Sequence, residues 1–155
     1  YVPELKLLFA GARGHGSFKQ MDGGERQSIE VAKTSMPVPR IVGSVSHRST
    51  AMVDFLEILG PHELQSFGSS LKICQVADGT VHLYPRLGPT SGWDTAAGHA
   101  VVLYAGGDVV KLDGARLDYN QKDSVLNPNF FVIGPRDHDW LGIARRVSES
   151  DPPRS

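Results

Sequence analysis

The sequence predicts an α/β fold. Stretches with strand character and stretches with helix character alternate along the chain, at the spacing that β–α–β units require. The 155 residues, 40% of them hydrophobic, suffice for one compact domain with a core. No internal repeat or low-complexity block interrupts the pattern. We therefore expect one α/β unit over residues 1–147 and a disordered polar tail over residues 148–155.

The N-terminal half opens with a β-hairpin. A glycine-rich turn over residues 11–16 separates two apolar strands, and the polar residues 20–37 predict a loop or a ragged sheet edge. Ser49 or Thr50 is the expected N-cap of the first amphipathic helix. The elements predicted in this half are a hairpin over 5–18, strands over 40–47 and 62–68, and helices over 49–60 and 69–78.

The C-terminal half continues the alternation. Pro85 is expected to break the strand that contains it. A helix around Asp94 ends at a Gly-Gly pair, and Asp139 is the expected cap of the last helix. The strands predicted in this half cover 80–87, 108–112, 115–119 and 129–134, and the last helix begins near residue 137.

Composition excludes several classes of function. The formal net charge of −1 argues against a surface that binds DNA or RNA, which would carry a basic excess. No apolar run approaches the roughly 20 residues that a membrane span needs. The single cysteine suits a reducing compartment, and the six histidines lack zinc-ligand spacing. We therefore expect a cytoplasmic protein without a membrane span.

The helix that contains Asp94 is the first candidate site. It lies in "GPTSGWDTAAGHAVVLYAGG", residues 88–107, and it is apolar on both faces, which predicts that it is buried. A buried helix N-terminus presents unpaired N–H groups and the positive end of the helix dipole, and both favour an anion. Asp94 can either cap this helix or bind a metal ion, and its position in the sequence leaves both roles open.

The helix predicted over residues 69–78 gives a second indication of an anion site. Lys72 lies in its first turn, where the dipole disfavours a cation unless an anion such as phosphate binds there; a solvent-exposed lysine is the alternative. Arg86, next to the proline, carries a planar guanidinium suited to phosphate. The residues "SVSH" (44–47) end a strand before a helix, where either a polar ligand or a simple capping loop fits.

Four stretches of the sequence together resemble a known family. "WDTAAGHAVVLYAGG" resembles the C-terminal signature of the inositol monophosphatase superfamily, the Mg²⁺-dependent, Li⁺-sensitive phosphatases. "VGSVSHRS", "GSSLKICQVADGTVHLYPRLGPT" and "LDY…SVLNPNFFV" are similar to the CysQ-type 3′(2′),5′-bisphosphate nucleotidases of that superfamily. The resemblance runs from Tyr1 to about Ile133. It implies the C-terminal part of the family's layered α/β/α/β/α sandwich.

The resemblance implies a Mg²⁺-dependent phosphomonoesterase that hydrolyses adenosine 3′,5′-bisphosphate to AMP and phosphate. Asp94 matches the metal-ligating aspartate of the family's W-D motif. Four residues match positions that contact the nucleotide or its non-scissile phosphate: Ser69 and Lys72 in "GSSLK", Arg86 in "YPR" and His47 in "SVSH". The implied partner is a small nucleotide. An inositol monophosphatase or sugar phosphatase of the same superfamily is the alternative.

The sequence departs from the family pattern in three ways. Val45 stands where "SRSH" has arginine, and Gly92 stands where "EWD" has glutamate. The family's other metal ligands, a D-P-[IL]-D-G-T motif and an upstream glutamate, precede the matched region and do not occur in this sequence. One carboxylate cannot supply the near-octahedral oxygen shell that Mg²⁺ requires. We therefore expect the C-terminal half of such an enzyme, inactive alone; a non-catalytic split fragment that binds nucleotide or a partner half is the alternative.

Overall fold

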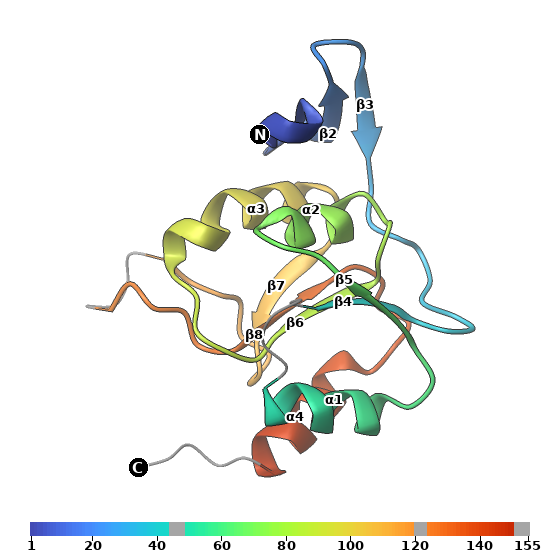
Figure 1. Cartoon of the computed structure of the whole chain (residues 1–155), viewed down its shortest axis with the longest axis vertical. Coiled ribbons are helices and arrows are strands. Elements are labelled where there is room, and N and C mark those ends of the chain that lie inside the picture. The colour runs from blue at the N-terminus through green and yellow to red at the C-terminus, as the bar shows by residue number, and fades with distance from the viewer. Residues whose placement is uncertain (44–48, 120–123, 151–155) are drawn as a thin grey trace.

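The computed structural model describes residues 1–43, 49–119 and 124–150, in which two sheets and two pairs of helices alternate as four layers (Figure 1). The predicted α/β class is confirmed. The smaller sheet contains β1 (Leu7–Ala12), β2 (Gly16–Met21) and β3 (Arg26–Ile29). The larger sheet contains β4 (Arg40–Gly43), β5 (Glu63–Ser66), β6 (Leu83–Arg86), β7 (Asp108–Lys111) and β8 (Phe130–Ile133). The helices are the 3-10 turn η1 (Pro3–Leu5), α1 (Thr50–Leu59), α2 (Leu71–Ala77), α3 (Gly92–Tyr104) and α4 (Trp140–Ser150).

The smaller sheet is antiparallel. β1 and β2 form the predicted hairpin, with Leu7 opposite Met21, and β3 adds to β2 with Ser17 opposite Ile29. The regular strand β3 lies within residues 20–37, for which the sequence predicts a loop or a ragged edge. Three of its four residues are exposed and polar, and only Ile29 is buried. Such an edge strand shows no apolar alternation, so the sequence pattern does not reveal it.

The larger sheet has the strand order β5-β4-β6-β8-β7. β4 pairs in parallel with β5 and β6, whereas β8 pairs antiparallel with β6 and β7. The expected break at Pro85 is wrong: Pro85 lies opposite Phe131 inside β6, since a proline removes one donor but keeps an extended backbone. The strand predicted over 115–119 is also wrong. After β7 the chain makes a short turn and then pairs with β7 only at an isolated bridge, in which Arg116 lies opposite Val110.

The ends of two helices follow their predicted capping signals. Ser49 is the N-cap of α1, and its Oγ accepts a hydrogen bond from the backbone N–H of Met52 at 3.3 Å. Asp139 precedes α4, and its Oδ1 accepts a hydrogen bond from the N–H of Gly142 at 2.9 Å. Both capping predictions are confirmed. The helix α4 extends through Ser150 and therefore into the residues for which the sequence predicts a tail.

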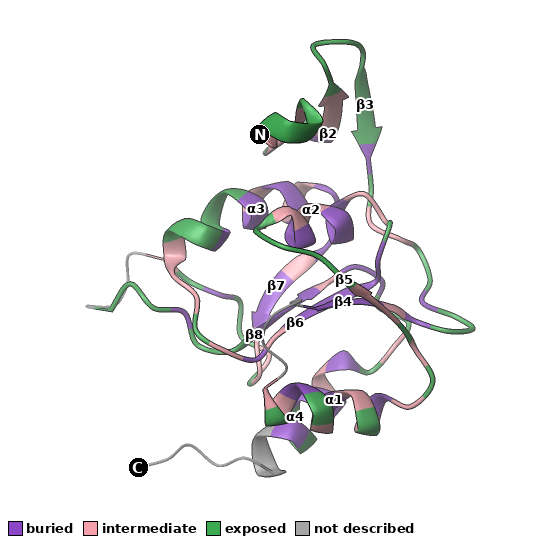
Figure 2. Ribbon diagram, in the orientation of Figure 1, coloured by how far each residue is buried: buried purple, intermediate pink, exposed green. Residues whose placement is uncertain are grey.

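Two hydrophobic clusters cover the two faces of the larger sheet (Figure 2). One lies under α2 and α3 and includes Val102 and Phe130. The other lies under α1 and α4, where the rings of Phe55 and Phe131 meet edge to face with centroids 5.1 Å apart. α3 also packs against β1 and β2, so the pair α2 and α3 forms a layer between the two sheets. None of the helices in the described ranges has the length and hydrophobicity that a bilayer crossing requires.

Candidate metal and nucleotide site

The parallel strands of the larger sheet direct several predicted site residues to one edge. β4 ends at Gly43, β5 ends at Ser66 before the loop that leads to α2, and β6 ends at Arg86. Because carboxyl ends of parallel strands meet at the same edge of a sheet, these loops converge, and ligands commonly bind at such an edge. His47 and Val45 follow β4 directly but lie outside the described residues.

Lys72 is buried at this edge, so the alternative of a solvent-exposed lysine is wrong. Its side chain is 5% exposed, and its Nζ donates hydrogen bonds to the backbone carbonyls of Phe67 at 3.1 Å and Ser69 at 2.9 Å. The ammonium also lies 5.3 Å from the ring centroid of Tyr84. Burial, and then the nearby charge of Arg86, lower the pKa of Lys72 below its ordinary value. The loop before α2 is therefore folded around this cation.

Ser69 forms the turn that Lys72 holds. Its backbone φ is +61°, in the left-handed region that non-glycine residues rarely adopt. Its Oγ accepts a hydrogen bond from the N–H of Leu71 at 3.3 Å, while Ser70 is the N-cap residue without a side-chain capping bond. The sequence predicts capping by these serines, and Ser69 carries the bond. Its exposed side chain leaves the hydroxyl accessible at the strand edge.

Tyr84 connects the charged residues of the site. It lies on β6 two residues before Arg86, and alternate residues of a strand face the same side. Burial is the largest cause that raises the pKa of Tyr84; the Arg86 guanidinium beside its hydroxyl opposes this shift, and the Asp94 carboxylate adds to it. Lys72, Arg86 and Asp94 therefore all lie near one phenol. The spacing in "LYPR" carries this signal, because it puts Tyr84 and Arg86 on the same side of a strand.

Arg86 joins the end of β6 to the loop that precedes α3. Its Nη2 donates a hydrogen bond to the carbonyl of Pro89 at 2.5 Å, and its buried Nε has no hydrogen-bond partner within the described ranges. Buried polar groups are normally paired, so this Nε is a donor that a ligand can use. Neither Arg86 nor Lys72 forms an ion pair with the residues that the structure describes.

Asp94 occupies the first turn of α3 in a capping box. The N-cap is Ser91, whose backbone N–H donates a hydrogen bond to Asp94 Oδ2 at 3.1 Å. In the described part of the chain, Oδ1 makes no hydrogen bond. Capping and metal binding are therefore compatible, since the cap uses one oxygen.

The expectation that α3 is buried all round is wrong. Trp93 is 72% exposed, and Asp94, Ala96 and Ala97 are exposed as well (Figure 2). The opposite face of the same turns is buried through Thr95 and Gly98. Alanine and glycine carry little apolar surface, so their hydropathy does not distinguish a buried face from an exposed one. The first turn of α3 thus opens to the surface of this chain.

Asp94 is one carboxylate and not a complete metal site. Among the described residues, no group of three or more His, Cys, Asp or Glu side chains is placed to hold a metal ion. Mg²⁺ takes about six oxygen ligands in near-octahedral geometry, of which one carboxylate provides one or two. The chemistry of an exposed Asp94 oxygen fits Mg²⁺, but the residues that the structure describes supply only part of the shell.

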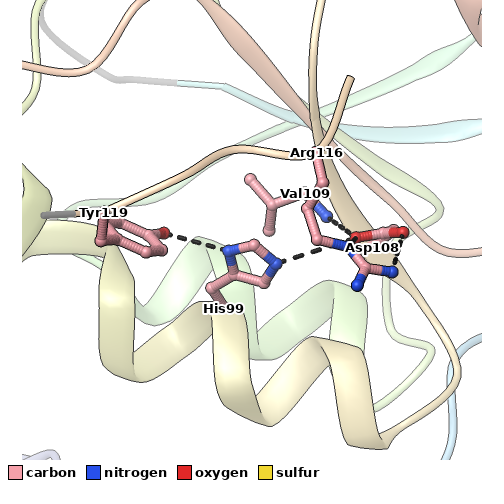
Figure 3. A network of polar contacts seen from close by, with 5 residues as sticks. All are labelled: His99, Asp108, Val109, Arg116 and Tyr119. Atoms are coloured by element: carbon pink, nitrogen blue, oxygen red, sulfur yellow. Dashed lines mark hydrogen bonds and ion pairs between the residues drawn. The ribbon is translucent and has the colours of Figure 1, made fainter. Parts of the chain in front are cut away.

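A polar network surrounds the buried His99 behind the first turn of α3, and no signal in the sequence predicts it. His99 on α3 lies between Tyr119 and Asp108, and Asp108 is paired with Arg116 (Figure 3). These residues are separated in sequence, and only the packing of α3 against β7 brings them together. In the sequence, His99 lies within "WDTAAGHAVVLYAGG" and Tyr119 within "LDY", both parts of the family resemblance, but neither stretch indicates that the two side chains meet.

Comparison with protein families matches residues 1–149 to the family described as the inositol monophosphatase family. This match extends beyond Ile133, where the sequence resemblance was expected to end. The chain is 45% identical over 132 residues to the 3′(2′),5′-bisphosphate nucleotidase CysQ of Salmonella typhimurium strain LT2, covering 85% of this chain and 52% of the relative. It is 43% identical over 132 residues to the protein of the same name from Escherichia coli K12, with the same coverage of 85% and 52%.

Solved structures of the inositol monophosphatase family are also similar to this chain. The structure of CysQ from Bacteroides thetaiotaomicron, described as a bacterial member of the inositol monophosphatase family, superposes with a TM-score of 0.73 at 36% identity, over 88% of this chain and 57% of that one. The inositol monophosphatase from Anabaena sp. PCC 7120 superposes with a TM-score of 0.70 at 26% identity, over 96% and 57%. The chain spans about half the length of the curated relatives it matches, at 52% of each.

Proposed function

The chain belongs to the inositol monophosphatase family, and we propose that it is the C-terminal part of a Mg²⁺-dependent phosphatase that hydrolyses adenosine 3′,5′-bisphosphate to AMP and phosphate. The name shared by the two bacterial relatives, 3′(2′),5′-bisphosphate nucleotidase, supports this substrate. In this proposal the full-length enzyme is cytoplasmic and its partner is the small nucleotide. The other half of the metal shell comes from residues outside these 155.

The observation that carries the proposal is the pair of cations at the carboxyl edge of the larger sheet. Lys72 and Arg86 lie close enough for the charge of Arg86 to lower the pKa of Lys72. Two neighbouring cations without an ion-pair partner in the described ranges repel each other, and a doubly charged phosphate relieves that repulsion. A substrate with two phosphates can place one at these cations and the other at the metal. Inositol monophosphate has no second phosphate for them.

Each residue then has a distinct task. Arg86 offers its Nε to a phosphate oxygen, and the ammonium of Lys72 adds charge while it holds the loop of Ser69. Asp94 directs one oxygen to Mg²⁺ and keeps the other on the N–H of Ser91. When bound, Mg²⁺ would polarise the scissile phosphate and activate water. His47 is proposed as a further contact to the nucleotide, on the segment that follows β4.

A comparison of two substrates tests the proposal. The full-length protein is supplied with adenosine 3′,5′-bisphosphate or inositol 1-phosphate, with and without Mg²⁺, and phosphate release is measured. We expect a value of kcat/KM at least about a hundredfold higher for the bisphosphate, the size of one or two charge-assisted hydrogen bonds. Higher turnover of inositol phosphate would instead assign the enzyme to that substrate. The 155-residue chain alone is expected to release no phosphate.

One observation favours a non-catalytic role for a chain of this length. The described residues lack a complete metal cluster, so the cations could bind nucleotide without hydrolysis. Calorimetry with AMP in the absence of metal tests this role, because a chain that binds nucleotide without metal should give a heat of binding, and no detectable heat would contradict it. Turnover by the full-length protein excludes it for that protein.

A further inference from the structure

A buried histidine connects the middle of α3 to a tyrosine from a distant loop (Figure 3). His99 is 5% exposed, and its Nδ1 lies 3.1 Å from the hydroxyl oxygen of Tyr119, with the two rings edge to face. Its Nε2 points toward Asp108 Oδ1 at 3.7 Å and has no closer hydrogen-bond partner in the described part of the chain. Burying a polar ring costs free energy unless its nitrogens are paired, so the neighbours of His99 indicate what the ring does.

The surroundings of Asp108 decide which nitrogen of His99 carries the proton. Oδ1 of Asp108 accepts hydrogen bonds from Arg116 Nε at 3.0 Å and from the N–H of Val109 at 2.9 Å, and Oδ2 accepts one from Arg116 Nη2 at 2.9 Å. This fixed carboxylate, paired with the Arg116 guanidinium, attracts an N–H and repels a lone pair. The proton of neutral His99 is therefore on Nε2. Nδ1 is left as an acceptor, and the hydroxyl of Tyr119 donates to it.

Tyr119 in turn packs against the first turn of α3. A Cβ placed on Gly92 would lie 3.5 Å from Tyr119 Cδ1, so the phenol ring rests directly on that glycine. Thr95 Oγ1 donates to the carbonyl of Gly92 at 3.2 Å, within the turn that carries Asp94. The contacts run from Asp108 through His99 and Tyr119 to the backbone around Asp94.

We infer that His99 is a positioning residue for Asp94: it anchors Tyr119 against the first turn of α3 and so fixes the direction of the Asp94 carboxylate. The metal-binding part of this inference rests on the proposed function, whereas the anchoring of the turn does not. Trp93, on the exposed face of the same turn, is 72% exposed, so its indole does not hold the turn against the rest of the protein. Besides the backbone hydrogen bond from the N–H of Gly92 to the carbonyl of Val125 at 2.9 Å, the turn is therefore held from its buried side.

Four single variants of the full-length protein test the inference. Tyr119→Phe removes only the donor to His99. His99→Asn keeps an acceptor where Nδ1 was, and His99→Gln keeps a polar group only where Nε2 was. Ser17→Ala is the matched control, because Ser17 Oγ donates to the carbonyl of Val101 at 2.7 Å, on the same helix but two turns from Asp94.

Two readouts are measured on each variant: hydrogen exchange of residues 91–97 without metal, and the Mg²⁺ concentration that gives half-maximal thermal stabilisation. We expect Tyr119→Phe and His99→Gln to exchange faster and to need about tenfold more Mg²⁺, as for outer-shell partners of metal ligands. His99→Asn and Ser17→Ala should stay within about twofold of the wild type.

The two readouts separate the possible failures. Unchanged exchange in Tyr119→Phe, or equal behaviour of His99→Asn and His99→Gln, would overturn the positioning role. A wild-type protein that Mg²⁺ does not stabilise would refute the proposed function, while the exchange data would still decide whether His99 holds the turn. A change in Ser17→Ala equal to that in Tyr119→Phe would show a general loosening of α3, and it would also overturn the inference.

Discussion

The ammonium of Lys72 donates a hydrogen bond of 2.9 Å to the backbone carbonyl of Ser69, the residue whose φ of +61° turns the chain into α2. The cation therefore has a structural partner before any ligand arrives. The same ammonium donates to Phe67, and Arg86 adds a second positive charge nearby. A phosphate that binds here finds the loop and the charge already in place, which lowers the entropy lost on binding.

Replacement of Lys72 by methionine should affect both stability and substrate binding. Lys72→Met removes two hydrogen bonds, and we expect a loss of about 1–3 kcal/mol in the free energy of unfolding. The KM for adenosine 3′,5′-bisphosphate should rise about tenfold or more with the loss of a charge-assisted contact. Lys19→Met is the control, since Lys19 is paired with Asp78 at 3.1 Å on another part of the surface. Equal KM values for the two variants would remove Lys72 from the binding site.

Gly98 determines how closely α2 and α3 can pack. A Cβ at this position would lie 3.1 Å from each of three side-chain carbons of Ile73, which is 1% exposed. Alanine is better than glycine in a helix by about 1 kcal/mol, but overpacking costs about 1–3 kcal/mol, so Gly98→Ala should destabilise the protein. Ile73→Val in the same background should recover part of the loss. Chemical unfolding measures both, and a more stable Gly98→Ala protein would contradict this packing.

His82 should make the protein sensitive to mild acid. It is 2% exposed, and its Nδ1 accepts a hydrogen bond of 2.9 Å from the backbone N–H of Arg40, which requires the neutral ring. Burial first, and then the charge of Arg40, lower the pKa of His82 from its ordinary value of 6.5. Between that lowered pKa and 6.5 the unfolded chain binds more protons than the folded one, so stability is lost as the pH falls through this window.

The variant His82→Asn tests this pH dependence, because the amide oxygen keeps an acceptor in the place of Nδ1. Unfolding free energies of both proteins are measured between about pH 7.5 and about pH 5, the range in which histidine titrates. The wild type should lose more stability over this range than the variant. Parallel curves for the two proteins would show that His82 does not contribute to the acid sensitivity.

The sequence predicts most of the fold because its helices and buried strands carry strong local signals. Ser49 and Asp139 have the residue types and spacing of caps, and both act as caps. β3 has no such signal, since Arg26, Gln27 and Ser28 face solvent and the strand forms through its ladder with β2. Pro85 misleads for a related reason: the pairing of β6 with β8 outweighs the loss of one donor.

The candidate site likewise contains residues that the sequence identifies and contacts that it does not predict. Lys72 is identifiable because a cation in the first turn of a helix opposes the helix dipole, and Arg86 and Asp94 because they lie at a strand end and at a helix start. The structure places all three around Tyr84. Burial of Lys72 is not predictable from its residue type, because it depends on two backbone carbonyls in the preceding loop. The contact of His99 with Tyr119 spans twenty residues and depends on tertiary packing alone.

The measurement that tests the account most directly is Mg²⁺-dependent phosphate release from adenosine 3′,5′-bisphosphate by the full-length protein and by its Asp94→Asn variant. Asparagine keeps an oxygen that can accept the hydrogen bond from Ser91, so the capping box should survive and the melting temperature should change little. We predict wild-type turnover that depends on Mg²⁺, and a loss of at least about a hundredfold in the variant. Full activity of a folded Asp94→Asn protein, or wild-type turnover without Mg²⁺, would contradict the assignment of Asp94 as a metal ligand.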